Sequence, residues 1–65
     1  MAKHELTKLE EMRRKAGLTQ MELSKKSGVT QATISRLEVV GVNDARVKTL
    51  LDLANAIGCE IGDFL

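Results

Sequence analysis

The segment from Gly17 to Glu38, GLTQMELSKKSGVTQATISRLE, constrains the fold of this chain more than any other part of it. It contains two Thr-Gln pairs, and each pair precedes a short run whose apolar residues have helical spacing. Threonine is a preferred helix N-cap, because its hydroxyl accepts a hydrogen bond from an unpaired backbone N–H of the first turn. Glu22 follows Thr19 by three residues and completes a capping box. The pattern predicts two helices, over residues 20–27 and 31–39.

Gly28 lies between these two predicted helices. Glycine adopts a positive φ without steric cost, so it can end one helix and turn the chain sharply into the next. Two helices joined by a short turn of this kind form a helix-turn-helix, in which the second helix enters the major groove of DNA. The segment therefore predicts a unit that reads DNA.

The rest of the chain predicts further helices, and the fold class is all-α. Apolar residues recur at three- and four-residue steps on both sides of the motif, and Asp44 is the expected N-cap of the helix that follows it. We expect a single helix-turn-helix domain over residues 1–65, built as a compact bundle of four to five short helices. The additional helices are predicted over residues 4–16, 45–57 and 60–65, with a loop over 40–44.

Composition excludes several other classes of protein. Phe64 is the only aromatic residue, so the core must be aliphatic. Cys59 is the only cysteine and His4 the only histidine, which leaves no disulfide and no cluster of metal ligands. We expect no metal, no cofactor, no enzymatic activity and no membrane association. We expect the protein to be located in a reducing cytoplasm. The net charge of +1 is low for a nucleic-acid binder and, taken alone, favours an ordinary mixed-charge surface.

From about Leu6 to Leu65, the chain resembles the lambda-repressor and Cro-like helix-turn-helix domains, also called the xenobiotic-response-element type. The resemblance rests on motifs that occur in order: Leu9-x-x-Met12-Arg13, Gly17-Leu18-Thr19-Gln20-x-x-Leu23, Gly28-Val29-Thr30-Gln31-x-x-Ile34-Ser35-Arg36-Leu37-Glu38 and Thr49-Leu50-Leu51-x-Leu53-Ala54-x-Ala56-Ile57-Gly58.

The resemblance implies a role for individual residues. Four positions of the second motif helix are expected to face DNA bases: Gln31, Ala32, Thr33 and Arg36. Contacts to the DNA backbone are expected from Gln20, Thr30, Ser35 and Asn43, and Gln20 is also expected to brace Gln31. Arg13 and Glu38 match a structural ion pair. The assignments agree with base chemistry, because glutamine pairs with adenine, arginine with guanine, and alanine or a threonine methyl with the thymine methyl.

The segment from Val39 to Asp44 departs from the family pattern. It is apolar, longer by about one residue, and lacks the proline that often precedes the next helix. In the family this loop approaches the DNA backbone, where Asp44 would be repulsive unless it is engaged as a helix cap.

These observations predict a transcriptional regulator that binds double-stranded DNA with sequence specificity. We expect a repressor that binds a near-palindromic operator as a homodimer, with residues 31–39 in the major groove. Two alternatives remain. In the first hypothesis, the chain is an antitoxin that binds a toxin partner and autoregulates its operon. In the second, it is a helix-turn-helix used only for protein contact.

Overall fold

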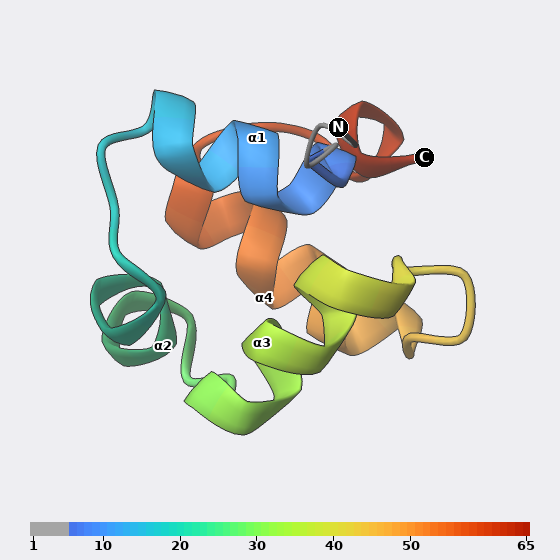
Figure 1. Cartoon of the computed structure of the whole chain (residues 1–65), viewed down its shortest axis with the longest axis horizontal. Coiled ribbons are helices and arrows are strands. Elements are labelled where there is room, and N and C mark those ends of the chain that lie inside the picture. The colour runs from blue at the N-terminus through green and yellow to red at the C-terminus, as the bar shows by residue number, and fades with distance from the viewer. Residues whose placement is uncertain (1–5) are drawn as a thin grey trace, which may run out of the picture.

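The computed structural model describes residues 6–65, and within that range it contains helices and no strand. Four are α-helices, namely α1 (Lys8–Lys15), α2 (Gln20–Ser27), α3 (Gln31–Val40) and α4 (Val47–Ile57), and the last element is a 3-10 helix, η1 (Ile61–Phe64) (Figure 1). The predicted all-α class is confirmed. The last short helix, expected over residues 60–65, is present as the 3-10 helix η1.

Threonine caps explain where the first three helices begin. Thr7, Thr19 and Thr30 each have extended backbone, and each hydroxyl accepts a hydrogen bond from a backbone N–H three residues later. The Thr19 capping box is confirmed, because Glu22 also accepts a hydrogen bond from the Thr19 backbone N–H at 2.8 Å. The cap at Thr7 also corrects the first predicted helix: α1 begins at Lys8, and the predicted start at His4 lies outside the described residues.

The turn between α2 and α3 is built as the sequence predicts. Gly28 has a φ of +78°, and its N–H bonds to the Ser24 carbonyl at 2.9 Å, which closes the last turn of α2. The Ser24 hydroxyl donates to the Val29 carbonyl at 2.6 Å. A side chain of α2 thus fixes the chain that leads into α3.

The start of α4 differs from the prediction. Asp44 is not the cap: α4 begins at Val47, and Arg46 is the N-cap residue without a side-chain cap hydrogen bond. The reason is Val42, which is buried and draws the loop inward. The Ala45 N–H then bonds to the Val42 carbonyl at 3.0 Å and forms a turn, which delays the helix. Asp44 is left on the exposed outer side of this loop.

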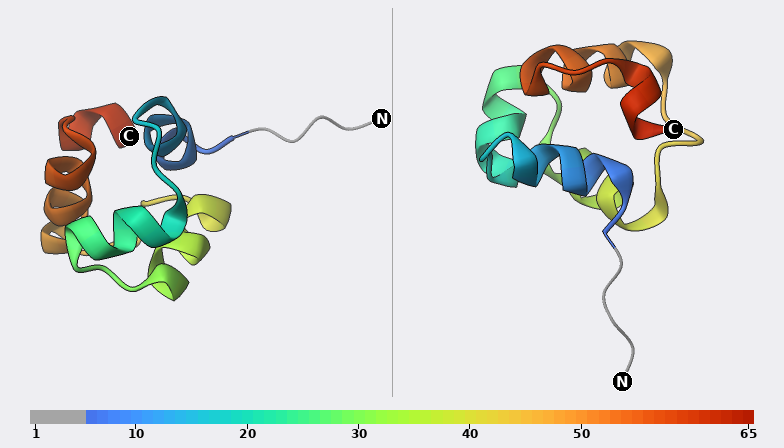
Figure 2. Two further views of the ribbon diagram at one scale, coloured as in Figure 1. Left: turned by 90° about the vertical axis from the view of Figure 1, so that its left-hand side faces the viewer. Right: turned by 90° about the horizontal axis from the view of Figure 1, so that it is seen from above.

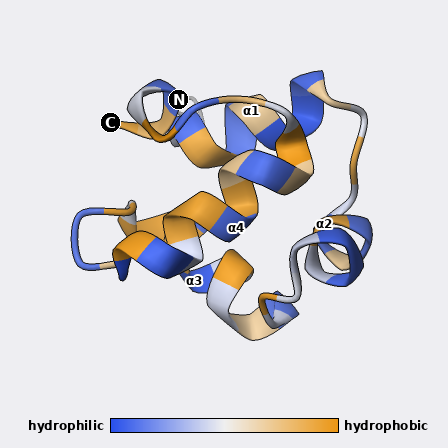
Figure 3. Ribbon diagram, turned by 180° about the vertical axis from the view of Figure 1, so that it is seen from behind, coloured by the Kyte–Doolittle hydropathy of each residue, from blue (hydrophilic) through white to orange (hydrophobic). Residues whose placement is uncertain are grey.

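The core is aliphatic apart from one ring, and every helix contributes to it. The buried apolar side chains are Leu9, Leu23, Ile34, Leu37, Val42, Leu50, Leu53, Ala54 and Phe64. Only part of the apolar surface of α4 is buried. Leu53 is fully buried, whereas Val47 and Leu51 are 67% and 47% exposed. Exposed apolar residues also occur at the end of α3. The end of α3 and the start of α4 are therefore coloured as hydrophobic on both sides of the hydrophilic loop that joins them (Figure 3).

The helices are arranged so that α2 holds α3 in place. α2 packs against both α3 and α4, and α1 packs against α3 and η1. Seen from above, α4 and α1 run along opposite sides of the molecule and α2 lies across one end (Figure 2). α3 is therefore supported from two sides, and one of its long edges is left at the surface.

Candidate nucleic-acid interface

The outer edge of α3 carries most of the residues that the sequence assigns to DNA bases. Ile34 and Leu37 point into the core. Because the helix repeats every 3.6 residues, this orientation turns the other faces outward. Gln31, Ala32, Ser35 and Arg36 are exposed, and Thr33 is half-buried. The structure thus gathers the four predicted base-contact positions on or next to one solvent-facing edge.

Thr30 and Thr33 set the geometry at the leading end of this edge. The Thr30 hydroxyl accepts from the Thr33 N–H at 3.2 Å and donates to the Thr33 hydroxyl at 2.9 Å. The Thr33 side chain is therefore held by the helix cap, which leaves its methyl group and its remaining hydroxyl capacity for a ligand.

Arg13 and Glu38 meet in the interior, behind the exposed edge of α3. Arg13 Nε donates to Glu38 Oε2 at 2.6 Å and Nη2 donates to Oε1 at 3.0 Å, so the pair is bidentate. Arg13 and Glu38 are 8% and 5% exposed. The hydrogen bond to Glu38 raises the pKa of the Arg13 guanidinium, against the opposing effect of burial. A third bond, from Arg13 Nη1 to the Leu18 carbonyl at 2.8 Å, fixes the chain between α1 and α2.

Gln20 is held by the same carboxylate. Its Nε2 donates to Glu38 Oε1 at 3.0 Å. The expected brace between Gln20 and Gln31 is therefore not formed: within residues 6–65, the two side chains share no hydrogen bond. The consequence is a different division of roles. Gln20 ties the start of α2 to the end of α3, and the exposed Gln31 carboxamide remains uncommitted.

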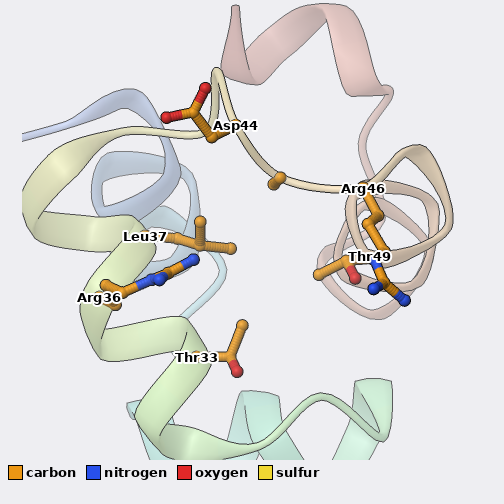
Figure 4. A pocket seen from close by; sticks show the side chains of 7 residues that line it. Thr33, Arg36, Leu37, Asp44, Arg46 and Thr49 are labelled. Atoms are coloured by element: carbon orange, nitrogen blue, oxygen red, sulfur yellow. The ribbon is translucent and has the colours of Figure 1, made fainter.

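A groove of about 270 Å³ lies between α3 and the start of α4. Thr33, Arg36 and Leu37 line it from α3, Asp44, Ala45 and Arg46 from the loop, and Thr49 from α4 (Figure 4). Arg36 points from α3 into the gap, and Arg46 lies on the opposite side beside Thr49. Asn43, the predicted loop contact, is exposed but does not line the groove.

Arg46 and Thr49 were not predicted as site residues. Their place in the site depends on how α4 is set against α3, and local patterns do not report that angle. The only available signal was an arginine at the end of a loop that precedes a helix.

The charges on this side of the molecule are free to meet a ligand. Within the described residues, Arg36, Arg46 and Asp44 make no hydrogen bond or ion pair through their side chains. Some basic residues elsewhere are paired along their own helices, as Lys15 is with Glu11 and Lys48 with Asp52. The two arginines at the groove are thus uncompensated by any partner in residues 6–65.

Within residues 6–65, no three side chains of the types that bind metals come together in a possible metal site. Burial, and then the charges of Asp63 and Glu60, raise the pKa of the Cys59 thiol, which keeps it protonated at neutral pH. Over the same residues, no helix has the length and apolar character needed to cross a membrane.

A comparison with protein families agrees with this geometry. The family model described as helix-turn-helix matches residues 9–64, which includes all five helical elements apart from the first residue of α1. No curated protein and no solved structure gave a match. The chain therefore belongs to the Cro/C1-type, lambda-repressor-like helix-turn-helix family of DNA-binding transcription regulators.

Proposed function

We propose that the protein binds double-stranded DNA with sequence specificity, with α3 in the major groove. The observation that carries this proposal is the exposed edge of α3, on which Thr33 is held by the helix cap while Gln31 and Arg36 have no side-chain partner within residues 6–65. In this arrangement Gln31, Ala32, Thr33 and Arg36 face the bases. A bidentate glutamine or arginine contact discriminates among base pairs by about 1–3 kcal/mol.

Contacts to the DNA backbone orient the protein on the duplex and supply most of the affinity. We assign these contacts to Gln20, Thr30, Ser35 and Asn43, and we add Arg46 and Thr49 from the groove beside α3. The free N–H groups at the starts of α2 and α3 also favour phosphate without a formal positive charge. This accounts for DNA binding by a chain whose net charge is only +1.

We further propose that the protein acts as a homodimeric repressor. A single reading helix covers one half-site, and two copies related by a two-fold axis would present their α3 helices about 34 Å apart. Exposed apolar side chains are available for contact between copies: Val39 and Val40 on α3, Val47 and Leu51 on α4, and Leu65. The site of action is the compartment that holds the DNA, which we take to be the cytoplasm.

Selection of binding sites from random duplexes, followed by sequencing, tests the proposal. The expected result is a short enriched motif, repeated as an inverted pair with about 10 base pairs between half-site centres. An enriched single half-site would contradict the dimer. No enrichment over the starting pool would contradict sequence-specific binding itself.

A second candidate function is that of an antitoxin. Val39 and Val40 are 77% and 69% exposed at the end of α3, and such side chains suit the surface of a protein partner. A stoichiometric complex purified from the source cell, in which the partner changes DNA affinity, would favour this function. If Ala substitutions at Gln31 and Arg36 left every activity intact, the helix-turn-helix would serve protein contact alone.

A further inference from the structure

We propose that Asp44 is a negative determinant of DNA affinity. Its carboxylate lies on the loop beside α3, where it repels the phosphate backbone and weakens binding to every duplex. This inference rests on the proposed function and identifies a residue that limits it.

The first step is the position of Asp44. It is among the residues that line the groove between α3 and α4, with Arg36 and Arg46, and its carboxylate points outward from the loop (Figure 4). Thr33 and Arg36 belong both to the groove and to the edge of α3 that is proposed to face bases. A major groove is bordered by phosphates on each side. If α3 enters it, one strand of the backbone passes close to the loop that carries Asp44.

The second step is that no structural role within residues 6–65 explains a carboxylate at position 44. It is not the cap of α4, which begins after Arg46. It makes no side-chain hydrogen bond or ion pair with any of residues 6–65. Other acidic side chains are engaged: Glu22 and Asp63 bond to backbone N–H groups, and Glu38 and Asp52 pair with basic residues. Among the acidic residues in the described part of the chain, Asp44 alone lines the groove.

The third step is electrostatic. A single carboxylate among several phosphates, at a solvated surface, opposes binding by a modest amount, because water screens each pair strongly. The carboxylate weakens both sequence-independent binding, which depends on charge contacts, and specific binding. It also reduces the dependence of the binding constant on salt concentration. Arg36 and Arg46 still attract the backbone, but Asp44 cancels part of their effect.

The experiment compares three variants with the wild-type chain by fluorescence anisotropy. Asp44→Asn removes the carboxylate with little change of shape, and Asp44→Glu retains the charge. Glu11→Gln is the matched control, because it makes the same change of net charge on α1, and α1 contributes no residue to the groove. The ion pair that Glu11 forms with Lys15 in the wild type is exposed. The probes are a random-sequence duplex and the selected duplex, titrated from about 50 to 200 mM salt. Circular dichroism melts check that all variants fold.

We expect Asp44→Asn to bind the random duplex about threefold to tenfold more tightly than the wild type at the lowest salt, with a slope of log K against log salt that is steeper by up to about one unit. Asp44→Glu should bind like the wild type, and Glu11→Gln should differ from it by less than about twofold. An Asp44→Asn variant that behaves like Glu11→Gln would overturn the inference. So would weaker binding, since the carboxylate would then be a positive contact.

The two proposals can fail separately. If the wild type prefers the selected duplex and Asp44→Asn has no effect, only the role of Asp44 is wrong. If the wild type binds both duplexes equally and Asp44→Asn still tightens binding, the specific function is wrong and the role of Asp44 stands. No binding of the wild type to either duplex would contradict both.

Discussion

Glu38 joins three helices through hydrogen bonds. Its side chain accepts from Arg13 of α1 and Gln20 of α2, and its carbonyl accepts from Thr7 at the start of α1 at 3.0 Å. A buried carboxylate is tolerated only when its hydrogen-bonding capacity is filled, and here each oxygen has a donor. The position of α3 relative to α1 and α2 therefore depends on one residue near its end.

Replacing Arg13 with alanine should leave this carboxylate buried without its charge partner. We expect a loss of about 3–5 kcal/mol in the free energy of unfolding, measured by urea denaturation, or loss of a cooperative transition. Lys15→Ala is the matched control, because its ion pair with Glu11 is exposed and should contribute at most about 1 kcal/mol. Equal effects of the two substitutions would show that the interior pair does not anchor the helices.

The helix boundaries can be predicted from a few local signals. The prediction fails where tertiary packing determines the boundary. Thr19, Thr30 and Gly28 specify α2, α3 and the turn between them from residue type alone, so the helix-turn-helix could be predicted. The start of α4 could not, because Asp44 is the better cap by type and burial of Val42 overrides it.

The candidate site also depends partly on local signals and partly on tertiary packing. Which residues of α3 face outward follows from helical periodicity, since Ile34 and Leu37 are apolar and must point inward. Two features were beyond local patterns. One is the bond from Gln20 to Glu38, two residues 18 positions apart in the chain. The other is the groove shared by Arg36, Arg46 and Thr49, which depends on how two helices are placed.

The turn between α2 and α3 should depend on the backbone conformation of Gly28 rather than on space around it. A Cβ added there would meet no atom within 4 Å, but φ is +78°. We expect Gly28→Ala to lower the free energy of unfolding by about 1–2 kcal/mol. Gly62→Ala is the control: it has equally open surroundings without a positive φ, and should be neutral or slightly stabilising. Similar losses in both variants would argue against backbone strain as the cause.

The start of α2 should respond to acid. The backbone N–H of Thr19 holds the pKa of Glu22 below its ordinary value, so folding favours the charged form. The stabilisation is present above the pKa of the unfolded chain and is lost as pH falls through the lower pKa of the folded chain. Thermal melts should therefore give the wild type a higher melting temperature than Glu22→Gln at neutral pH, and the two melting temperatures should converge as the pH falls through the lowered pKa of the folded chain. A difference independent of pH would show that the charge has no part in the cap.

At the scale of the whole molecule, the fold supports one helix from behind and leaves its polar edge open. α2 packs against α3 and α4, and the Glu38 cluster fixes the far end of α3 to α1. Arg36 and Arg46, which have no partner within residues 6–65, line the groove beside that same edge. Under the proposed function, specificity and affinity come from one surface, with base contacts on α3 and backbone contacts at its borders.

The most direct test is the ratio of affinities for the selected and random duplexes, measured for the wild type, Arg36→Ala and Lys26→Ala. Both substitutions remove one exposed positive charge, but only Arg36 lies on the reading edge of α3. We predict that Arg36→Ala reduces the ratio by about tenfold or more and that Lys26→Ala leaves it unchanged. If both variants kept the ratio of the wild type, α3 would not be the element that reads the sequence.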